Sequence, residues 1–347
     1  MTKRFLINGM LTVLCACLLA CGVHTDDTTV EAQDVTPVIG TPEPDKPASP
    51  KATAVPTPTP EPTPEPTPEP KPFTMLWIAD TQNYAYMSDE GLKSIVDYAL
   101  DAKDELNIIA VLHSGDVVEN NAKDSEWEKI KKDFEPLRGN IPFYCVCGNH
   151  DLGHRTGIST VRTHGYGQYF KYDLCDVRAE EQRYNSGECW YQFLEEQQLL
   201  LVGIGWPLDE EDPARLEWLD RVLDAYAAYP ALILTHNYLY NNGLLSTGGM
   251  KLEREVVSRH ANVRLLLCGH HKGIRRLQQT YEDGSRTFTA VMYNLQLDNT
   301  NGTGYCTLLT FDPIARSVSF TSYSPYFDDY NYLSKPDRET FVLENAF

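Results

Sequence analysis

Short apolar runs bounded by polar or turn residues recur along most of the chain, which is typical of buried strands. They lie at residues 74–80, 107–116, 142–151, 189–194, 198–206, 231–236 and 263–268. Between them, apolar residues at helical spacing predict helices at residues 90–105, 125–134, 213–227 and 251–260. Strands that alternate with helices indicate an α/β fold with a parallel core. The short alternating runs from residue 273 to about residue 324 predict antiparallel strands.

The first 72 residues do not follow this pattern. Lys3 and Arg4 precede an apolar run that ends at Ala20, and Cys21 follows, so residues 1–21 have the layout of a secretory signal. Their end resembles a bacterial lipobox, in which the thiol of Cys21 is lipidated. The apolar run is shorter than the ~20 residues that a membrane-spanning helix needs. We therefore expect an extracytoplasmic protein that is attached to the bacterial cell membrane only through a lipid anchor.

Residues 22–72 are expected to form a spacer rather than part of a folded core. They contain PTPTPEPTPEPTPEP and almost no large apolar residues, a composition that favours extended polyproline II structure. A ligand for a proline-binding module is the alternative, and the extracytoplasmic compartment argues against it. The folded domain is expected at residues 73–327, followed by a tail at residues 328–347. Disulfides can form outside the cytoplasm, and Cys175 with Cys189 is the best candidate pair, because both lie in a polar, irregular stretch.

The charge balance of the chain excludes some partners. Among the 347 residues, Asp and Glu number 49 and Lys and Arg number 30, which gives a net charge of −19. Nucleic acid attracts basic proteins, so no nucleic-acid partner is expected and a nuclease is disfavoured. An acidic balance is compatible with the binding of cations. We also expect a monomer.

Polar residues with metal-binding chemistry follow one predicted strand after another. They are Asp80-Thr81-Gln82, Gly115-Asp116, Gly148-Asn149-His150-Asp151, His236 and Gly269-His270. In open α/β sheets, ligands bind beyond the carboxyl ends of the strands. Carboxylates, amides and histidines at that edge supply the oxygen and nitrogen atoms that divalent metals bind. The sequence therefore predicts a metal site at this edge.

These motifs, in this order, resemble those of the calcineurin-like metallophosphoesterase family, which includes the purple acid phosphatases. The family motifs are D-x-H, G-D, G-N-H-[DE], a lone H and G-H-x-H. The first motif here, D-T-Q, and a late SYSPYFDDY are similar to a branch of the family whose first motif carries Gln. The resemblance covers about residues 74–324. It implies the family's α/β fold, a four-layer sandwich of two mixed β-sheets flanked by helices.

The resemblance also implies one or two divalent metal ions per chain. Six residues would hold them: Asp80, Gln82, Asp116, Asn149, His236 and His270. Asp116 would bridge the two ions, because metals about 3.5–4 Å apart share a carboxylate. Mixed nitrogen and oxygen ligands suit Mn, Fe or Zn. A metal-bound hydroxide would attack the phosphorus of a phosphate monoester or diester. His150 would act as a general acid or as a hydrogen-bond donor to phosphate, and Asp151 would orient His150.

Two positions depart from the family motifs. Gln82 stands where the first motif has a histidine ligand, and Lys272 stands where G-H-x-H has its second histidine. A protonated lysine has no lone pair for a metal, so the hypothesis is an intact second metal site and a weakened first one. Lys272 would then bind phosphate as a point charge, or the neighbouring His271 would take over as a ligand. In the long insertion after the third motif, His154 and Arg155 could contact the substrate.

The sequence thus predicts a lipid-anchored, metal-dependent phosphoesterase that acts on a phosphorylated small molecule or a nucleotide. The alternative is a catalytically reduced surface protein that binds a metal or a ligand on the same fold, an idea motivated by Gln82 and Lys272. An enzyme should lose turnover in Asp116→Asn and His150→Ala while staying folded. A binding protein should be indifferent to His150→Ala.

Overall fold

The computed structural model describes residues 69–347, except for residues 153–174, 178, 185–188, 209–211, 282–283, 285, 296–303, 331 and 334–335. The signal region with Cys21, almost all of the spacer, and both His154 and Arg155 lie outside the described residues. Pro66–Phe347 form one compact unit. Within the described part of the chain, no helix combines the length and the apolar character needed to cross a membrane.

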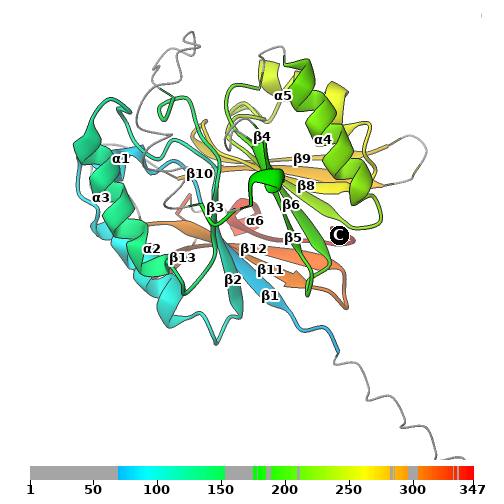
Figure 1. Cartoon of the computed structure of the whole chain (residues 1–347). Coiled ribbons are helices and arrows are strands. Elements are labelled where there is room, and N and C mark those ends of the chain that lie inside the picture. Colours follow the sequence, from blue (N-terminus) through cyan, green and yellow to red (C-terminus); the bar gives the residue numbers. More distant parts are fainter. Residues whose placement is uncertain are drawn as a thin grey trace, which may run out of the picture. The chain divides into compact units, whose positions relative to one another are not determined.

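Two mixed sheets pack against each other, with helices on their outer faces, as the predicted four-layer sandwich requires (Figure 1). The first sheet has the order β13-β12-β11-β1-β2-β3, and β14 pairs with β12. Its strands are β1 (Phe73–Ile78), β2 (Ile108–His113), β3 (Phe143–Cys145), β11 (Cys306–Asp312), β12 (Ser317–Ser324), β13 (Asp329–Tyr330) and β14 (Thr340–Leu343). β1, β2 and β3 are parallel, whereas β11 and β12 are antiparallel to their neighbours.

The second sheet has the order β4-β5-β6-β7-β8-β10-β9. Its strands are β4 (Arg183–Tyr184), β5 (Cys189–Leu194), β6 (Leu199–Ile204), β7 (Ala231–Thr235), β8 (Val263–Cys268), β9 (Gly273–Thr280) and β10 (Thr287–Asn294). β6, β7, β8 and β10 are parallel, while β5 and β9 are antiparallel to the strands beside them.

The helices cover the two outer faces of the sandwich. α2 and α3 lie on the first sheet, and α4 and α5 lie on the second (Figure 1). The helical segments are α1 (Gln82–Tyr86), α2 (Glu90–Asp101), α3 (Asp124–Phe134), η1 (Glu135–Leu137), η3 (Glu180–Gln182), α4 (Pro213–Ala225), α5 (Thr247–Leu252), η4 (Glu253–Val257) and α6 (Pro336–Glu339). α4 begins where the sequence favours it, because Asp212 accepts a hydrogen bond from the backbone N–H of Arg215 and Pro213 occupies the first turn.

Residues of the buried strands alternate between two hydrophobic clusters. On β6, Leu199 and Leu201 belong to the cluster that includes the inner face of the first sheet, while Leu200 and Val202 belong to the cluster beneath α4. Both sets are buried. This is why the strand reads as a continuous apolar run rather than as an alternating one.

Two predictions about the chain's organisation are wrong. Residues 328–347 are not a tail beyond the domain, because β14 pairs with β12 and Leu343 and Ala346 are buried in the core. The third strand is much shorter than residues 142–151, since β3 ends at Cys145. The chain must leave the sheet there to form the loop that carries the third motif.

The proposed pairing of Cys175 with Cys189 is also wrong, because both thiols are free. Cys175 lies in the cluster that contains β3, and its sulfur is 4.0 Å from the carbonyl oxygen of Cys145. Cys189 lies in the other cluster, on the side of the second sheet that faces α4. The second sheet therefore separates the two side chains.

Candidate metal centre

The candidate site lies where strands of both sheets end at the same edge of the sandwich. Asp80, Asp116 and His270 come two or three residues after β1, β2 and β8, and their φ angles are 53°, 53° and 66°. Non-glycine residues adopt positive φ uncommonly, at a cost of order 1–3 kcal/mol each. The backbone therefore turns sharply at all three strand ends, and the turns direct the side chains to a common region.

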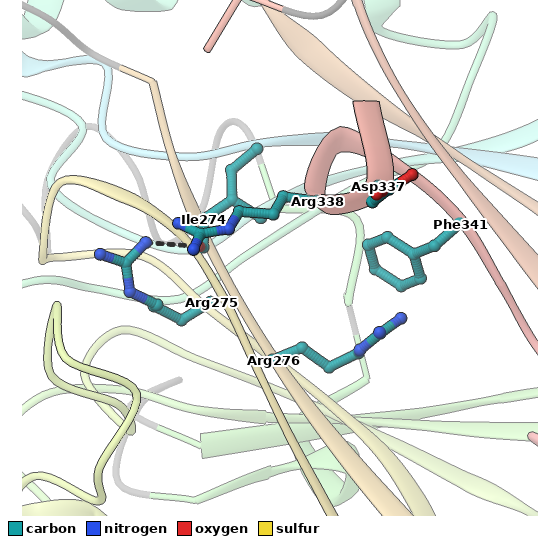
Figure 2. A pocket seen from close by; sticks show the side chains of 6 residues that line it. All are labelled: Ile274, Arg275, Arg276, Asp337, Arg338 and Phe341. Atoms are coloured by element: carbon teal, nitrogen blue, oxygen red, sulfur yellow. Dashed lines mark hydrogen bonds between the residues drawn. The ribbon is translucent and has the colours of Figure 1, made fainter. Parts of the chain in front are cut away.

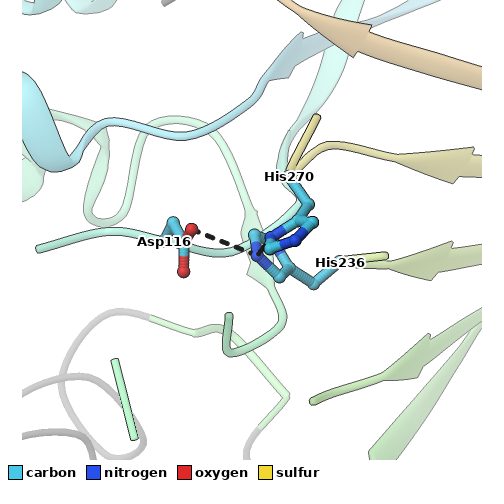
Figure 3. Close-up of side chains that lie close together, drawn as sticks. All are labelled: Asp116, His236 and His270. Atoms are coloured by element: carbon cyan, nitrogen blue, oxygen red, sulfur yellow. Dashed lines mark hydrogen bonds and ion pairs between the residues drawn. The ribbon is translucent and has the colours of Figure 1, made fainter. Parts of the chain in front are cut away.

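Four side chains converge on one point, and three of them are drawn in Figure 3. Nε2 of His236 lies 3.1 Å from Oδ2 of Asp116, 3.1 Å from Oδ1 of Asn149 and 3.0 Å from Nδ1 of His270. Nδ1 of His236 donates to the carbonyl of Ser114 at 2.9 Å, so Nε2 faces the other three atoms. Oδ2 of Asp116, Oδ1 of Asn149 and Nδ1 of His270 can each offer a lone pair, and Nε2 of His236 offers one when a metal ion replaces its proton. Such a group suits a divalent metal ion.

Two glycines leave room for the carboxylates of the site. A Cβ on Gly148 would lie 2.2 Å from Oδ1 of Asp116, and a Cβ on Gly269 would lie 2.2 Å from Oδ1 of Asp80. Both distances are far below a permitted contact, so any larger residue would displace a carboxylate. The glycines of the third and fifth motifs are therefore required by the site rather than by the turns alone.

Asp80 is held by Asn294, a residue that the sequence reading missed. Asp80 is buried, Oδ1 accepts a hydrogen bond from the backbone N–H of His270 at 3.1 Å, and Oδ2 accepts one from the side-chain amide of Asn294. Asn294 ends β10, so it carries the same signal as the other site residues, a polar residue at a strand end. It was overlooked because the region was expected to be only antiparallel, whereas β10 pairs in parallel with β8.

Two buried polar atoms on the other side of the site have no hydrogen-bond partner among the described residues. They are Oε1 of Gln82, at the start of α1, and Nε2 of His271. A buried polar atom without a partner costs on the order of 1–3 kcal/mol, and such atoms often mark a site for an unseen ligand. These two atoms are available to an additional ligand, and the roles of Gln82 and His271 at a first metal site stay predictions.

His150 is positioned by Glu119 and not by Asp151, which corrects the predicted role of Asp151. Nδ1 of His150 lies 3.0 Å from the carbonyl oxygen of Glu119 and 3.2 Å from its carboxylate. Asp151 instead accepts three backbone hydrogen bonds, from Val117 and Val118 at 2.8 and 3.1 Å and from Gly148 at 2.8 Å. These bonds occupy both of its oxygens and join the loops after β2 and β3. Asp151 therefore stabilises the scaffold of the site.

The charges of the site depend strongly on one another. Burial opposes ionisation of Asp116, yet the charge and hydrogen bond of His236, together with the nearby His150 and His270, lower the pKa of Asp116 to about 2. Burial also opposes a charge on His236, yet Asp116 raises the pKa of His236 to about 9. Burial lowers the pKa of His270 to about 3 and raises the pKa of Asp80 well above its usual value. A neutral His270 and a carboxylate that needs a cation are what a metal site requires.

Two further residues border the site. The ring of Trp206 stacks on His270 with centroids 5.8 Å apart, and its edge-on contact with His236 has a centroid distance of 6.2 Å. Trp206 thereby fixes the orientation of both histidines, a role that the sequence did not reveal. Lys272 is exposed, and its neighbour His271 packs against Tyr240 at 5.2 Å. Lys272 therefore lies at the surface beside the site and not among the buried ligands.

Comparisons with known proteins agree with this fold and this geometry. A family model described as calcineurin-like phosphoesterase matches residues 73–272, which is more than half of the chain. The chain therefore belongs to the calcineurin-like phosphoesterase family. The structure of purple acid phosphatase PPD1 from yellow lupin (Lupinus luteus) seeds is similar, with a TM-score of 0.54 and 14% identity, over 80% of this chain and 54% of that chain. That likeness shows a shared fold.

One curated relative has a clearly similar sequence. The chain is 29% identical over 284 residues to the uncharacterized protein YvnB of Bacillus subtilis (strain 168). The match covers 79% of this chain and 21% of YvnB, so the chain spans about a fifth of the length of that relative.

Proposed function

We propose that this protein is a metal-dependent phosphoesterase that hydrolyses a monoester or diester of a phosphorylated small molecule or a nucleotide. The proposal depends mainly on one observation. Oδ2 of Asp116, Oδ1 of Asn149 and Nδ1 of His270 all lie within about 3 Å of Nε2 of His236. Membership of the calcineurin-like phosphoesterase family supports it.

The residues of the site divide into two ligand sets. Asp116, Asn149, His236 and His270 would hold one ion, and Asp80, Gln82 and the shared Asp116 would hold the other. When bound, divalent ions such as Mn, Fe or Zn neutralise phosphate charge and make water a better nucleophile. The set with Asn149, His236 and His270 is the more complete. The set with Asp80 has the amide of Gln82 where the family has a histidine. Lys272 lies too exposed to replace a buried ligand and carries the wrong charge for one.

His150 is the residue that we propose acts on the substrate itself. Its side chain is 17% exposed, so it can reach a bound phosphate ester, and Glu119 holds its Nδ1. Its Nε2 is then directed away from Glu119 and is free to donate a proton or a hydrogen bond to an ester oxygen. The backbone N–H of His150 donates to Oδ1 of Asp116 at 2.9 Å, which ties this residue directly to the metal-binding carboxylate.

A titration of metal-stripped protein with Mn tests both the function and the difference between the two sets. Hydrolysis of p-nitrophenyl phosphate should appear only after metal is added. It should require more Mn than is needed to fill the tighter of the two sites, the one with Asn149, His236 and His270. Gln82→His restores a nitrogen ligand, so it should lower the Mn concentration for half-maximal activity about tenfold. Asn83→His, which places the same side chain one residue further along α1, should leave that concentration unchanged. No hydrolysis with Mn, Fe or Zn would favour the binding-protein alternative.

We also propose that the protein is extracytoplasmic and lipid-anchored to a bacterial membrane. The layout of residues 1–21 and the proline-rich spacer support this. In a bacterial host that processes lipoproteins, the full chain should incorporate labelled palmitate and partition into detergent, and Cys21→Ser should abolish both. Cys15→Ser, inside the apolar run, serves as the matched control. Unchanged partitioning of the Cys21→Ser variant would contradict the anchor.

A further inference from the structure

A pocket of about 250 Å³ lies where β9 of the second sheet approaches α6 and β14 of the first (Figure 2). Six residues line it: Ile274, Arg275, Arg276, Asp337, Arg338 and Phe341. Three guanidinium groups and one carboxylate give this lining a net charge of +2 (3 − 1), while the whole chain carries −19. We refer to it as the arginine pocket.

Contacts hold two of the three guanidinium groups, and none of the three has an ion-pair partner among the described residues. Nη1 of Arg275 donates to the carbonyl of Ile274 at 2.7 Å, and Cζ of Arg276 lies 4.5 Å from the centre of the Phe341 ring. Among the described residues, no carboxylate lies within ion-pairing distance of Arg275, Arg276 or Arg338. The lining carries more positive than negative charge, since Asp337 is its one carboxylate, so a bound anion would stabilise the arrangement.

The strand register places the arginine pocket beside the metal centre. β9 begins at Gly273, which pairs with Asn294, the residue whose side chain donates to Asp80. Neighbouring strands lie about 4.8 Å apart and each residue advances about 3.3 Å along a strand, so Arg276 lies on the order of 10–15 Å from Asp80. The pocket therefore lies toward the end of β9 that meets Asn294, the partner of Asp80.

The chemistry of the lining selects the ligand class. Guanidinium groups form paired hydrogen bonds with phosphate oxygens, and their planar shape suits this better than an ammonium group does. The pocket contributes one apolar residue, Ile274, and one aromatic ring, Phe341, so it offers little burial for a large apolar group. The lining thus suits a compact, multiply charged oxyanion such as a phosphate group.

Resting on the proposed phosphoesterase activity, we propose that the arginine pocket binds a second phosphate group of the substrate. The substrate class is then a small molecule with two phosphate groups separated by on the order of 10–15 Å, the spacing that the strand register gives. One phosphate ester is hydrolysed at the metal centre while the other is bound by Arg276 and Arg338. Substrates with a single phosphate are also hydrolysed, but they bind more weakly than substrates with two phosphates.

Kinetics on a matched substrate series test this proposal. The probes are alkanediol bisphosphates from ethanediol to dodecanediol, each compared with the corresponding alkanol monophosphate. The wild-type KM should be at least about tenfold lower for the best bisphosphate than for its monophosphate, with similar kcat. Arg276→Gln and Arg338→Gln should raise the bisphosphate KM to the monophosphate value and leave monophosphate kinetics unchanged. Arg276→Lys, which keeps the charge but loses the planar contact with Phe341, should have an intermediate KM.

Arg254→Gln provides the matched control. It removes the same charge from an exposed arginine whose one ion-pair partner among the described residues is its neighbour Glu255. Its bisphosphate KM should equal that of the wild type. An equal rise in all three glutamine variants would show a general charge effect, and equal KM values for mono- and bisphosphates in the wild type would show that the pocket holds no substrate phosphate. Either result overturns the proposal.

Calorimetry separates a failure of this proposal from a failure of the proposed function. The full chain, stripped of metal, is titrated with the same bisphosphate, so that binding does not depend on hydrolysis. Binding that is weakened about tenfold by Arg276→Gln but not by Arg254→Gln supports the pocket even where no substrate is turned over. Inorganic phosphate that binds as tightly as the bisphosphate, with no effect of the variants on bisphosphate KM, would show a site for free phosphate and contradict the proposal.

Discussion

Replacing Asp116 with asparagine should reduce hydrolysis of p-nitrophenyl phosphate by at least about 10³-fold, which corresponds to roughly 4 kcal/mol of activation free energy. In the proposed site both ligand sets share Asp116, and His236 lies within hydrogen-bonding distance of Asp116, Asn149 and His270. Asparagine is neutral and cannot balance the charge of two ions, so metal content measured by elemental analysis should fall with activity.

The fold should survive this change. An asparagine at residue 116 can still accept the hydrogen bond from the backbone N–H of His150, and it avoids burying an unpaired charge. Asp133→Asn is the matched control, because Asp133 is also buried but pairs with Lys93 on α2, outside the site. It should keep full activity and metal content. An active, metal-loaded Asp116→Asn variant would contradict the proposed site.

His150→Ala should lower kcat for an alkyl phosphate by about 10²–10⁴-fold without loss of metal, because His150 is not among the expected ligands. An alkoxide is a poor leaving group and needs a proton as the ester bond breaks. A p-nitrophenolate needs no proton, so the same variant should lose about tenfold or less with p-nitrophenyl phosphate. This difference between leaving groups is the signature of a general acid.

Equal losses with both leaving groups would instead make His150 a hydrogen-bond donor to phosphate, which is the other role that the family resemblance implies. Glu119→Gln tests the positioning of His150. It keeps the backbone carbonyl that contacts Nδ1 but removes the carboxylate, so its effect should be smaller than that of His150→Ala and should show the same dependence on the leaving group. An unchanged kcat with both substrates would show that His150 takes no part in hydrolysis.

Much of the fold was readable from local patterns. The strand and helix order, the parallel core and the two mixed sheets follow from apolar runs, helical spacing and the family motifs, and the structure confirms them. The failures occurred where long-range pairing overrides local signals. β14 is only four residues long and buries only Leu343, yet its backbone hydrogen bonds to β12 make it part of the first sheet.

By itself, the sequence determined which residue types stand at the strand ends, and hence which chemistry the chain can perform. Asp80, Asp116 and His270 were identified because a polar residue after a buried strand is a local feature. Only the tertiary structure decided what those residues contact. Asn294 reaches Asp80, Glu119 replaces Asp151 as the partner of His150, and three arginines from two distant segments share one pocket.

The physical reason is that some properties depend on residues close in the sequence, whereas others depend on segments that are far apart along the chain. Burial and backbone conformation follow from neighbours in the sequence, because side chains alternate along a strand with a fixed period. Side-chain contacts depend on strand order and register, and these are set by the packing of segments that lie far apart along the chain. The sequence therefore determined the candidate ligands at the strand ends, while the fold determined their hydrogen-bond partners and the charged pocket on β9.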